Sequence, residues 1–175
     1  IVTLAKGIAS SYMPLSATVT RQTIFEQFLH DPGDKLKYFR DISTYGGNAA
    51  ACAAAMENIR IIEDENLLEH VTGMGEYLVG SLKELESHPM VGEVRGKGLF
   101  AGVELVVDKN TKEPAGEQVM GKILADAAGQ GVLLGKMNRS VPGRNNVITM
   151  APAYIITKDE IDRIVSALRT ALERI

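Results

Sequence analysis

The chain places apolar residues three or four positions apart along several stretches, the spacing that gathers them on one face of an α-helix. The clearest stripe runs from Leu67 to Leu85 and stops before Pro89, which cannot continue a helix. Thr157 and Glu160 have the spacing of a capping box, and a further apolar stripe follows them. In all, helices are predicted over residues 21–29, 49–63, 67–85, 116–128 and 158–175.

Short apolar or alternating runs predict strands around these helices. The run at residues 1–5 has no cap or turn before it, so we interpret it as a strand entered midway and expect a further part of the protein upstream. Glycines in residues 95–98 are followed by strand rather than helix, which indicates a hairpin-like turn and argues against a dinucleotide site. The strands are predicted over residues 1–5, 15–20, 91–94, 99–107, 132–134 and 147–151, and this order of elements indicates an α/β fold.

The composition of the chain argues against two classes of function, nucleic-acid binding and membrane spanning. A net charge of −3 with both signs mixed gives no basic face for nucleic acid, and no apolar run is long enough to span a membrane. Cys52 is the single cysteine, so no internal disulfide can form, and we expect a reducing, cytoplasmic location. Because Cys52 lies in an alanine run, it is predicted to be a small buried helix residue.

Lys6 is the first candidate for chemistry. It follows the opening strand and precedes Gly7, so its amine could project into a cleft at a strand end, where α/β proteins place ligands. A desolvated lysine has a lowered pKa, and its neutral amine can attack a carbonyl group. The pattern alone favours the alternative, a surface lysine at the end of a strand.

Residues 44–48 form the second candidate. Thr44, Gly46 and Gly47 precede a predicted helix start, and a hydroxyl with flexible backbone N–H groups at that place could bind an anion. The alternative is a glycine turn with Asn48 as the helix N-cap.

Two arginines and three histidines complete the candidates. Arg139 and Arg144 lie in a polar loop between two predicted strands, and either guanidinium could bind a substrate carboxylate through two hydrogen bonds. Solvated surface arginines would look the same in the sequence. The histidines are scattered, at residues 30, 70 and 88, and no metal-ligand spacing is present in the sequence.

Four of these segments, in the same order along the chain, resemble the class III aminotransferases. Residues 4–15 around Lys6 are similar to the family's Schiff-base segment, and residues 44–48 are similar to its phosphate-binding segment. Residues 94–99 and 151–157 also match, so the resemblance covers essentially the whole chain.

The resemblance implies a fold type I enzyme that depends on pyridoxal 5′-phosphate (PLP). Lys6 would be the Schiff-base lysine and the base that moves the proton. Thr44, with Tyr45 and Gly46, would bind the PLP phosphate of the neighbouring subunit, which implies a homodimer with a shared active site. Residues 1–48 would be the end of the large PLP-binding domain, and residues 49–175 the bridging helix and the small carboxy-terminal α/β domain.

The implied reaction moves an amino group from an omega-amino acid or amine to pyruvate or another 2-oxo acid. Thr149 stands where several relatives carry arginine, which favours the omega-amino-acid or taurine branch and leaves Arg139 or Arg144 to bind the substrate carboxylate. The family's other cofactor contacts lie upstream of Lys6. We therefore expect these 175 residues alone neither to hold PLP tightly nor to turn over.

Two alternatives stay open from the sequence. Another class III reaction, such as that of an aminomutase or a decarboxylase, would use the same scaffold. A non-catalytic domain that retains the fold is the other possibility, and a lysine retained at a buried strand end argues against it.

Overall fold

The computed structural model describes residues 1–29, 33–34, 39, 42–137 and 141–175. The chain forms two compact units, Ile1–Glu65 and Asn66–Ile175. The predicted domain boundary at residue 48 concerns the architecture of a whole class III enzyme and stays a prediction. In both units helices and strands combine as predicted, which confirms the α/β class.

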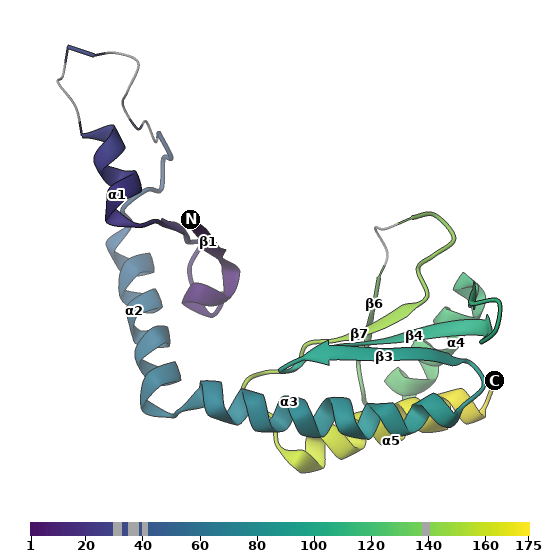
Figure 1. Cartoon of the computed structure of the whole chain (residues 1–175). Helices are drawn as coiled ribbons and strands as arrows, with labels where there is room; N and C mark the ends of the chain where they lie inside the picture. The colour runs from purple at the N-terminus through teal and green to yellow at the C-terminus, as the bar shows by residue number, and fades with distance from the viewer. Residues whose placement is uncertain (30–32, 35–38, 40–41, 138–140) are drawn as a thin grey trace. The chain divides into compact units, whose positions relative to one another are not determined.

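The first unit contains a two-stranded antiparallel ribbon and one long helix (Figure 1). Asn48 begins the long helix, because its side-chain Oδ1 accepts a hydrogen bond of 3.0 Å from the Ala51 N–H. The predicted N-cap is therefore confirmed. The elements are β1 (Val2–Ala5), η1 (Lys6–Ala9), β2 (Ser16–Val19), α1 (Gln22–Phe25), η2 (Glu26–Phe28) and α2 (Ala49–Asp64).

Little apolar surface is buried in this first unit. Among its described residues, the buried hydrophobic side chains are Ala9, Ala51 and Ala55. Met56 is 72% exposed on α2, and Cys52 is exposed as well, so the prediction of a buried Cys52 is wrong. The reason is that α2 turns Ala51 and Ala55, one turn apart, toward the rest of the unit and leaves the neighbouring face uncovered.

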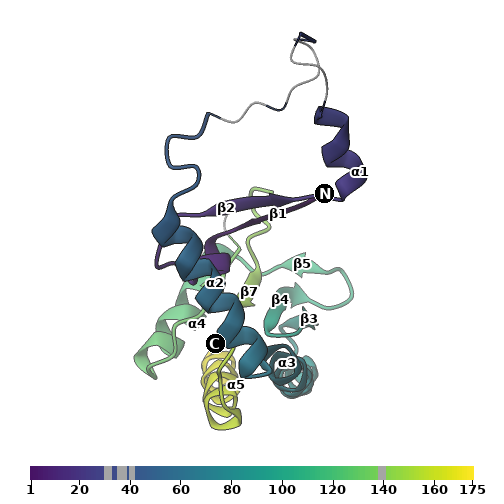
Figure 2. The ribbon, with the colours of Figure 1, turned by 90° about the vertical axis from the view of Figure 1, so that its left-hand side faces the viewer.

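The second unit is an antiparallel sheet covered by helices on one face (Figures 1 and 2). Its strands follow the order β3–β4–β7–β6, and β5 pairs with β4 off this path. Helices α3 and α5 lie side by side under the sheet, and α4 packs against α5. The elements are α3 (Leu67–Lys83), η3 (Glu84–Ser87), β3 (Val91–Lys97), β4 (Phe100–Asp108), β5 (Glu113–Pro114), α4 (Glu117–Gly129), β6 (Gly135–Lys136), β7 (Val147–Met150) and α5 (Lys158–Glu173).

Alternation along the strands divides the sheet into a buried and an open face. On β4, Ala101, Val103 and Leu105 are buried against the helices, whereas Gly102 and Glu104 between them are only half-buried. The predicted stripe of α3 supplies Leu78 and Leu82 to the same core. The hydrophobic core of the second unit therefore lies between the sheet and its helices.

Two predictions about strands need correction in the second unit. The predicted strand at residues 132–134 is wrong, because the pairing with β7 begins at Gly135, opposite Thr149. Val132 is buried but its neighbour Leu133 is 90% exposed. The apolar residues at 132–134 therefore form no strand pairing, although their hydrophobicity suggested one. The short strand β5 was not among the predicted strands.

Candidate active site

Lys6 lies where the chain leaves β1 and begins the 3₁₀ turn η1. Its φ is 53°, in the left-handed region that residues other than glycine seldom adopt. Ser10 and Ser11 have φ values of 46° and 63° in the same loop. A run of such residues stores backbone strain, and strain of this kind gathers at functional sites.

Asn58, on α2, holds this loop in place. Its Nδ2 donates hydrogen bonds of 3.1 Å to the backbone oxygens of both Gly7 and Ile8. The Gly7 oxygen also accepts a hydrogen bond of 3.1 Å from the Ser10 N–H, which closes the turn. Asn58 was not among the predicted site residues, since an asparagine on a helix gives no sign in the sequence that it binds a loop about 50 residues earlier.

A cavity of about 660 Å³ brings Lys6 together with two of the other predicted site residues. Tyr45 and Gly46 line it, with Gly47 and the hydroxyl-bearing Ser11 and Ser16. Gly47 has a φ of 72°, which glycine adopts without steric cost, and this lets the chain turn beside Lys6.

Thr44 does not line this cavity and is exposed. The turn around it is closed by the Gly46 N–H, which donates to the Ser43 oxygen at 3.0 Å, and by the Asn48 N–H, which donates to the Tyr45 oxygen at 3.3 Å. Its predicted contact, with the cofactor of a neighbouring subunit, stays a prediction.

Lys6 itself is exposed, and so is the whole of β1. The sequence argument that a lysine at a buried strand end needs a function is therefore wrong for this chain. The case for Lys6 depends instead on its backbone conformation and on the residues that share its cavity.

Of the two arginines predicted to bind a substrate carboxylate, Arg139 and Arg144, the structure describes only Arg144. Arg139 lies outside the described residues. Arg144 is exposed in the second unit, where its backbone N–H donates to the Val141 oxygen at 3.0 Å. It lines a separate hollow over the open face of the sheet, together with Thr149.

A match to a family model identifies the protein family of this chain. The family model described as aminotransferase class-III matches residues 1–172. The chain belongs to the class III aminotransferases.

Known class III relatives are similar along nearly the whole chain. The taurine–pyruvate aminotransferase of Rhodobacter capsulatus is 51% identical over 175 residues, which cover 99% of this chain and 38% of that protein. The taurine–pyruvate aminotransferase of Bilophila wadsworthia is 52% identical over 172 residues, with coverages of 98% and 38%. An aminotransferase of Bacillus anthracis has a solved structure that matches with a TM-score of 0.93 and 44% identity, over 99% of this chain and 38% of its own.

Class III aminotransferases depend on PLP, and the cavity at Lys6 fits parts of that cofactor. A lysine amine can react with an aldehyde, and serine hydroxyls with a glycine turn can donate hydrogen bonds to a phosphate. Ser11, Ser16 and Gly47 supply such donors next to Lys6. The residues present therefore fit the reactive groups of PLP.

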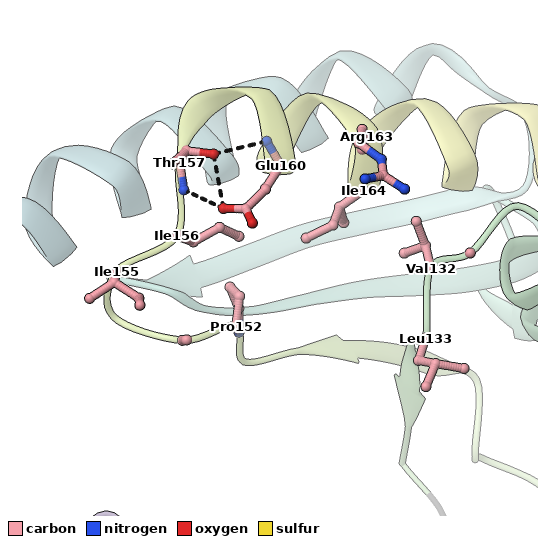
Figure 3. A pocket seen from close by; sticks show the side chains of 11 residues that line it. Val132, Leu133, Pro152, Ile155, Ile156, Thr157, Glu160, Arg163 and Ile164 are labelled. Carbon is pink, nitrogen blue, oxygen red and sulfur yellow. Dashed lines mark hydrogen bonds between the residues drawn. The ribbon is translucent and has the colours of Figure 1, made fainter.

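A further pocket of this class III chain, in the second unit, offers little chemistry (Figure 3). Apolar side chains from two loops and α5 line most of it, and Leu133 and Ile155 are among them. Its acid, Glu160, is engaged by the Thr157 backbone N–H at 2.8 Å and by the Thr157 hydroxyl at 2.9 Å. The hydrogen bond from that N–H holds the pKa of Glu160 below its usual range, so Glu160 serves the helix cap.

The described residues give no sign of a metal site or a membrane span. Within residues 1–29, 33–34, 39, 42–137 and 141–175, no group of three or more potential His, Cys, Asp or Glu ligands comes together. No described helix is both long and apolar enough to cross a membrane.

Proposed function

We propose that the protein is a PLP-dependent transaminase that moves an amino group from an omega-amino acid or amine to pyruvate or another 2-oxo acid. The observation that carries the proposal is Lys6, held in a left-handed conformation at the end of β1 and lining a cavity with Ser11 and Ser16. The names of the taurine–pyruvate relatives support the choice of donor and acceptor. Because the chain spans 38% of those relatives, the proposal concerns the activity of the whole protein.

In this proposal Lys6 has two tasks. Its Nζ would hold the cofactor covalently in the resting enzyme. Once the substrate amine has displaced it, the freed amine would take the proton from the substrate carbon that bears the amino group. PLP, when bound, supplies the electron sink that makes this proton acidic. Asn58 keeps the loop after Lys6 in one conformation through the two carbonyls that it binds, so the amine returns to the same place in each turnover.

The proposal assigns phosphate binding to the glycine turn. Thr44 would donate to the phosphate in the site of a second subunit, with Tyr45 and Gly46 beside it, and the enzyme would be a cytoplasmic homodimer. The exposure of Thr44 and Tyr45 within this chain supports this, since side chains that serve a partner lie at the surface of their own subunit. Arg139 or Arg144 would bind the acidic group of the substrate.

An absorption spectrum of the full-length protein with PLP, taken before and after borohydride, tests the central assignment. We expect a band near the visible edge that borohydride removes, with the reduced cofactor mapped by peptide mass to Lys6. Lys6→Ala should lose the band, whereas Lys122→Gln, an exposed change on α4, should keep it. A label on another lysine, or no band at all, would contradict the assignment.

The same preparation separates the alternatives. Amino transfer requires pyruvate or a similar acceptor, whereas an aminomutase or a decarboxylase forms product from the amine alone. Product without an acceptor would therefore replace the transaminase proposal with one of these reactions. Cofactor chemistry unchanged in Lys6→Ala would favour a non-catalytic domain.

A further inference from the structure

The loop between β1 and β2 brings the chain back beside Lys6. Ala5 and Ser16 are partners in the antiparallel register of the two strands, which lie side by side (Figure 2). Lys6 follows Ala5, so Lys6 and Ser16 stand at the two feet of one loop. Ser10 and Ser11, both left-handed, turn the chain between the feet. As a result Ser11, Ser16 and Lys6 line the same cavity.

This cavity offers hydroxyl groups but no carboxylate. Its lining residues in the described part of the chain include no Asp or Glu, and Lys6 takes part in no salt bridge there. The hydroxyls of Ser11 and Ser16 come from the same loop as Lys6, and neither has a hydrogen-bond partner among the described residues. The other hydroxyls, of Ser43 and Tyr45, belong to the segment of the glycine turn, to which phosphate binding is assigned above.

Hydroxyl partners suit a base that must change its protonation state. A carboxylate beside a lysine stabilises the charged ammonium form, which cannot take a proton. A serine oxygen accepts a hydrogen bond from an N–H of the ammonium group and of the neutral amine alike, and it leaves the lone pair of the neutral amine free. The hydroxyl also keeps its own proton, so it can still donate to a phosphate.

We propose that Ser11 and Ser16 are positioning residues for Lys6, whose hydroxyls hold its amine in the cavity after the substrate has displaced it. The inference rests on the proposed function and deepens it, because it concerns the interval in which the freed amine acts as the base. It differs from the role of Asn58, which fixes the backbone of the loop rather than the amine. Only hydrogen bonds to the lysine form and break.

Ser11→Ala and Ser10→Ala in the full-length protein form a matched pair. Both replace serine by alanine at a left-handed residue, with φ values of 63° and 46°, and only Ser11 lines the cavity. The attachment of PLP to Lys6, in which amine and aldehyde join with loss of water, is trapped with borohydride and mapped by peptide mass. We expect Ser11→Ala to slow it about threefold to tenfold, the range for one lost hydrogen bond, and Ser10→Ala to leave it unchanged.

Reductive methylation with formaldehyde and cyanoborohydride, in the absence of PLP, separates position from reactivity. Formaldehyde is small and reaches an amine in any orientation, so Lys6 should be methylated at the same rate in Ser11→Ala and in the unchanged protein. Methylation slowed by the same factor as PLP attachment would overturn the inference, because it would indicate lost access rather than lost orientation.

Ser16 gives an independent arm with a conservative rescue. Ser16→Ala should slow PLP attachment as Ser11→Ala does, whereas Ser16→Thr keeps a hydroxyl at a strand residue, where threonine is well tolerated, and should retain most of the rate. With the amine substrate, the loss in either alanine variant should appear in kcat and not in KM, because the hydroxyls act on the freed lysine. Equal rates in Ser16→Ala and Ser16→Thr would contradict a role for the hydroxyl.

The labelling experiment also separates this inference from the proposed function. Lys6 labelled at equal rates in Ser11→Ala, Ser10→Ala and the unchanged protein would overturn the positioning role and leave the proposed function standing. No labelling of Lys6 in the unchanged protein would overturn the proposed function and the positioning role with it.

Discussion

Gly75 on α3 marks the closest approach between a helix and the sheet. A Cβ at this position would lie 2.4 Å from both the carbonyl carbon and the oxygen of Gly98, in the turn between β3 and β4. Backbone atoms cannot swing aside as a flexible side chain can. The helix and the turn are thus in contact only because residue 75 lacks a side chain, and Gly98, with a φ of 53°, has its own need for glycine.

Gly75→Ala should therefore lower the free energy of unfolding by roughly 1–3 kcal/mol, the usual cost of overpacking a core. Gly80→Ala on the same helix is the control, because nothing lies within 4 Å of an added Cβ there. That change should be neutral or stabilise the helix by up to about 1 kcal/mol. Urea unfolding followed by circular dichroism measures both, and equal effects would contradict the close contact.

Asn58 is the residue whose effect on Lys6 can be isolated. Asn58→Asp replaces the Nδ2 donor by an oxygen that faces two carbonyl oxygens, and Asn58→Leu removes the donor altogether. Either change should slow PLP labelling of Lys6 by about fivefold, which corresponds to the loss of about 1 kcal/mol of hydrogen bonding. Borohydride trapping and peptide mapping give the rate, with the other lysines of the chain as internal reference.

Glu63→Gln serves as the control for Asn58, since Glu63 is an exposed residue of the same helix. Labelling of Lys6 at the unchanged rate in both Asn58 variants would show that the two hydrogen bonds do not position the amine.

At the scale of elements, α5 depends on its first turn. The Glu160 N–H donates to the Thr157 hydroxyl at 3.3 Å while the Glu160 carboxylate accepts from the Thr157 N–H, so both halves of the capping box are present. Thr157→Ala should lower the free energy of unfolding by about 1 kcal/mol. Thr157→Ser keeps a hydroxyl at the cap and should therefore lower it much less; urea unfolding followed by circular dichroism measures both.

The same cap should depend on pH in one direction. The lowered pKa of Glu160 means that the unfolded chain binds its proton more readily than the folded chain does. The contribution is complete above the unfolded pKa of about 4.3 and is lost as the pH falls through the lower, folded pKa. Glu160→Gln should therefore lose less stability than the unchanged chain between neutral pH and about pH 3. Parallel acid titrations of chemical unfolding measure this difference, and equal losses in the two proteins would show that the carboxylate is not engaged.

Elements with strong local signals are the ones that the sequence predicted well. The α3 stripe, the Asn48 cap and the Thr157–Glu160 box follow from spacing within a few residues, and all are present. The strand at residues 132–134 failed because its apolar residues are divided between the core and the surface by tertiary packing. Cys52 failed similarly, since periodicity locates a stripe on a helix but does not say which stripe is covered.

At the scale of the whole molecule, the two units differ in how much of their apolar surface is covered. The core of the second unit combines side chains from α3, α4, α5 and the sheet, whereas the described part of the first unit buries only alanines. The family resemblance singled out Lys6 and residues 44–46 as site residues, and their roles stay predictions. Asn58 was not predicted, because its contact with the Lys6 loop joins segments about 50 residues apart and appears only in the folded chain.

The order of the sheet also bears on how the protein is made. Strand β4 leaves the ribosome long before its partner β7, and the face that both present to the helices is closed by Ile161 and Leu168 of α5. Until α5 has emerged, α3 can cover only part of the β3–β4 hairpin, and the apolar surface that α5 later meets stays exposed. Growing chains of this protein thus expose part of an apolar core between the synthesis of the β3–β4 hairpin and that of α5, and a stalled product that lacks α5 is a natural client for chaperones.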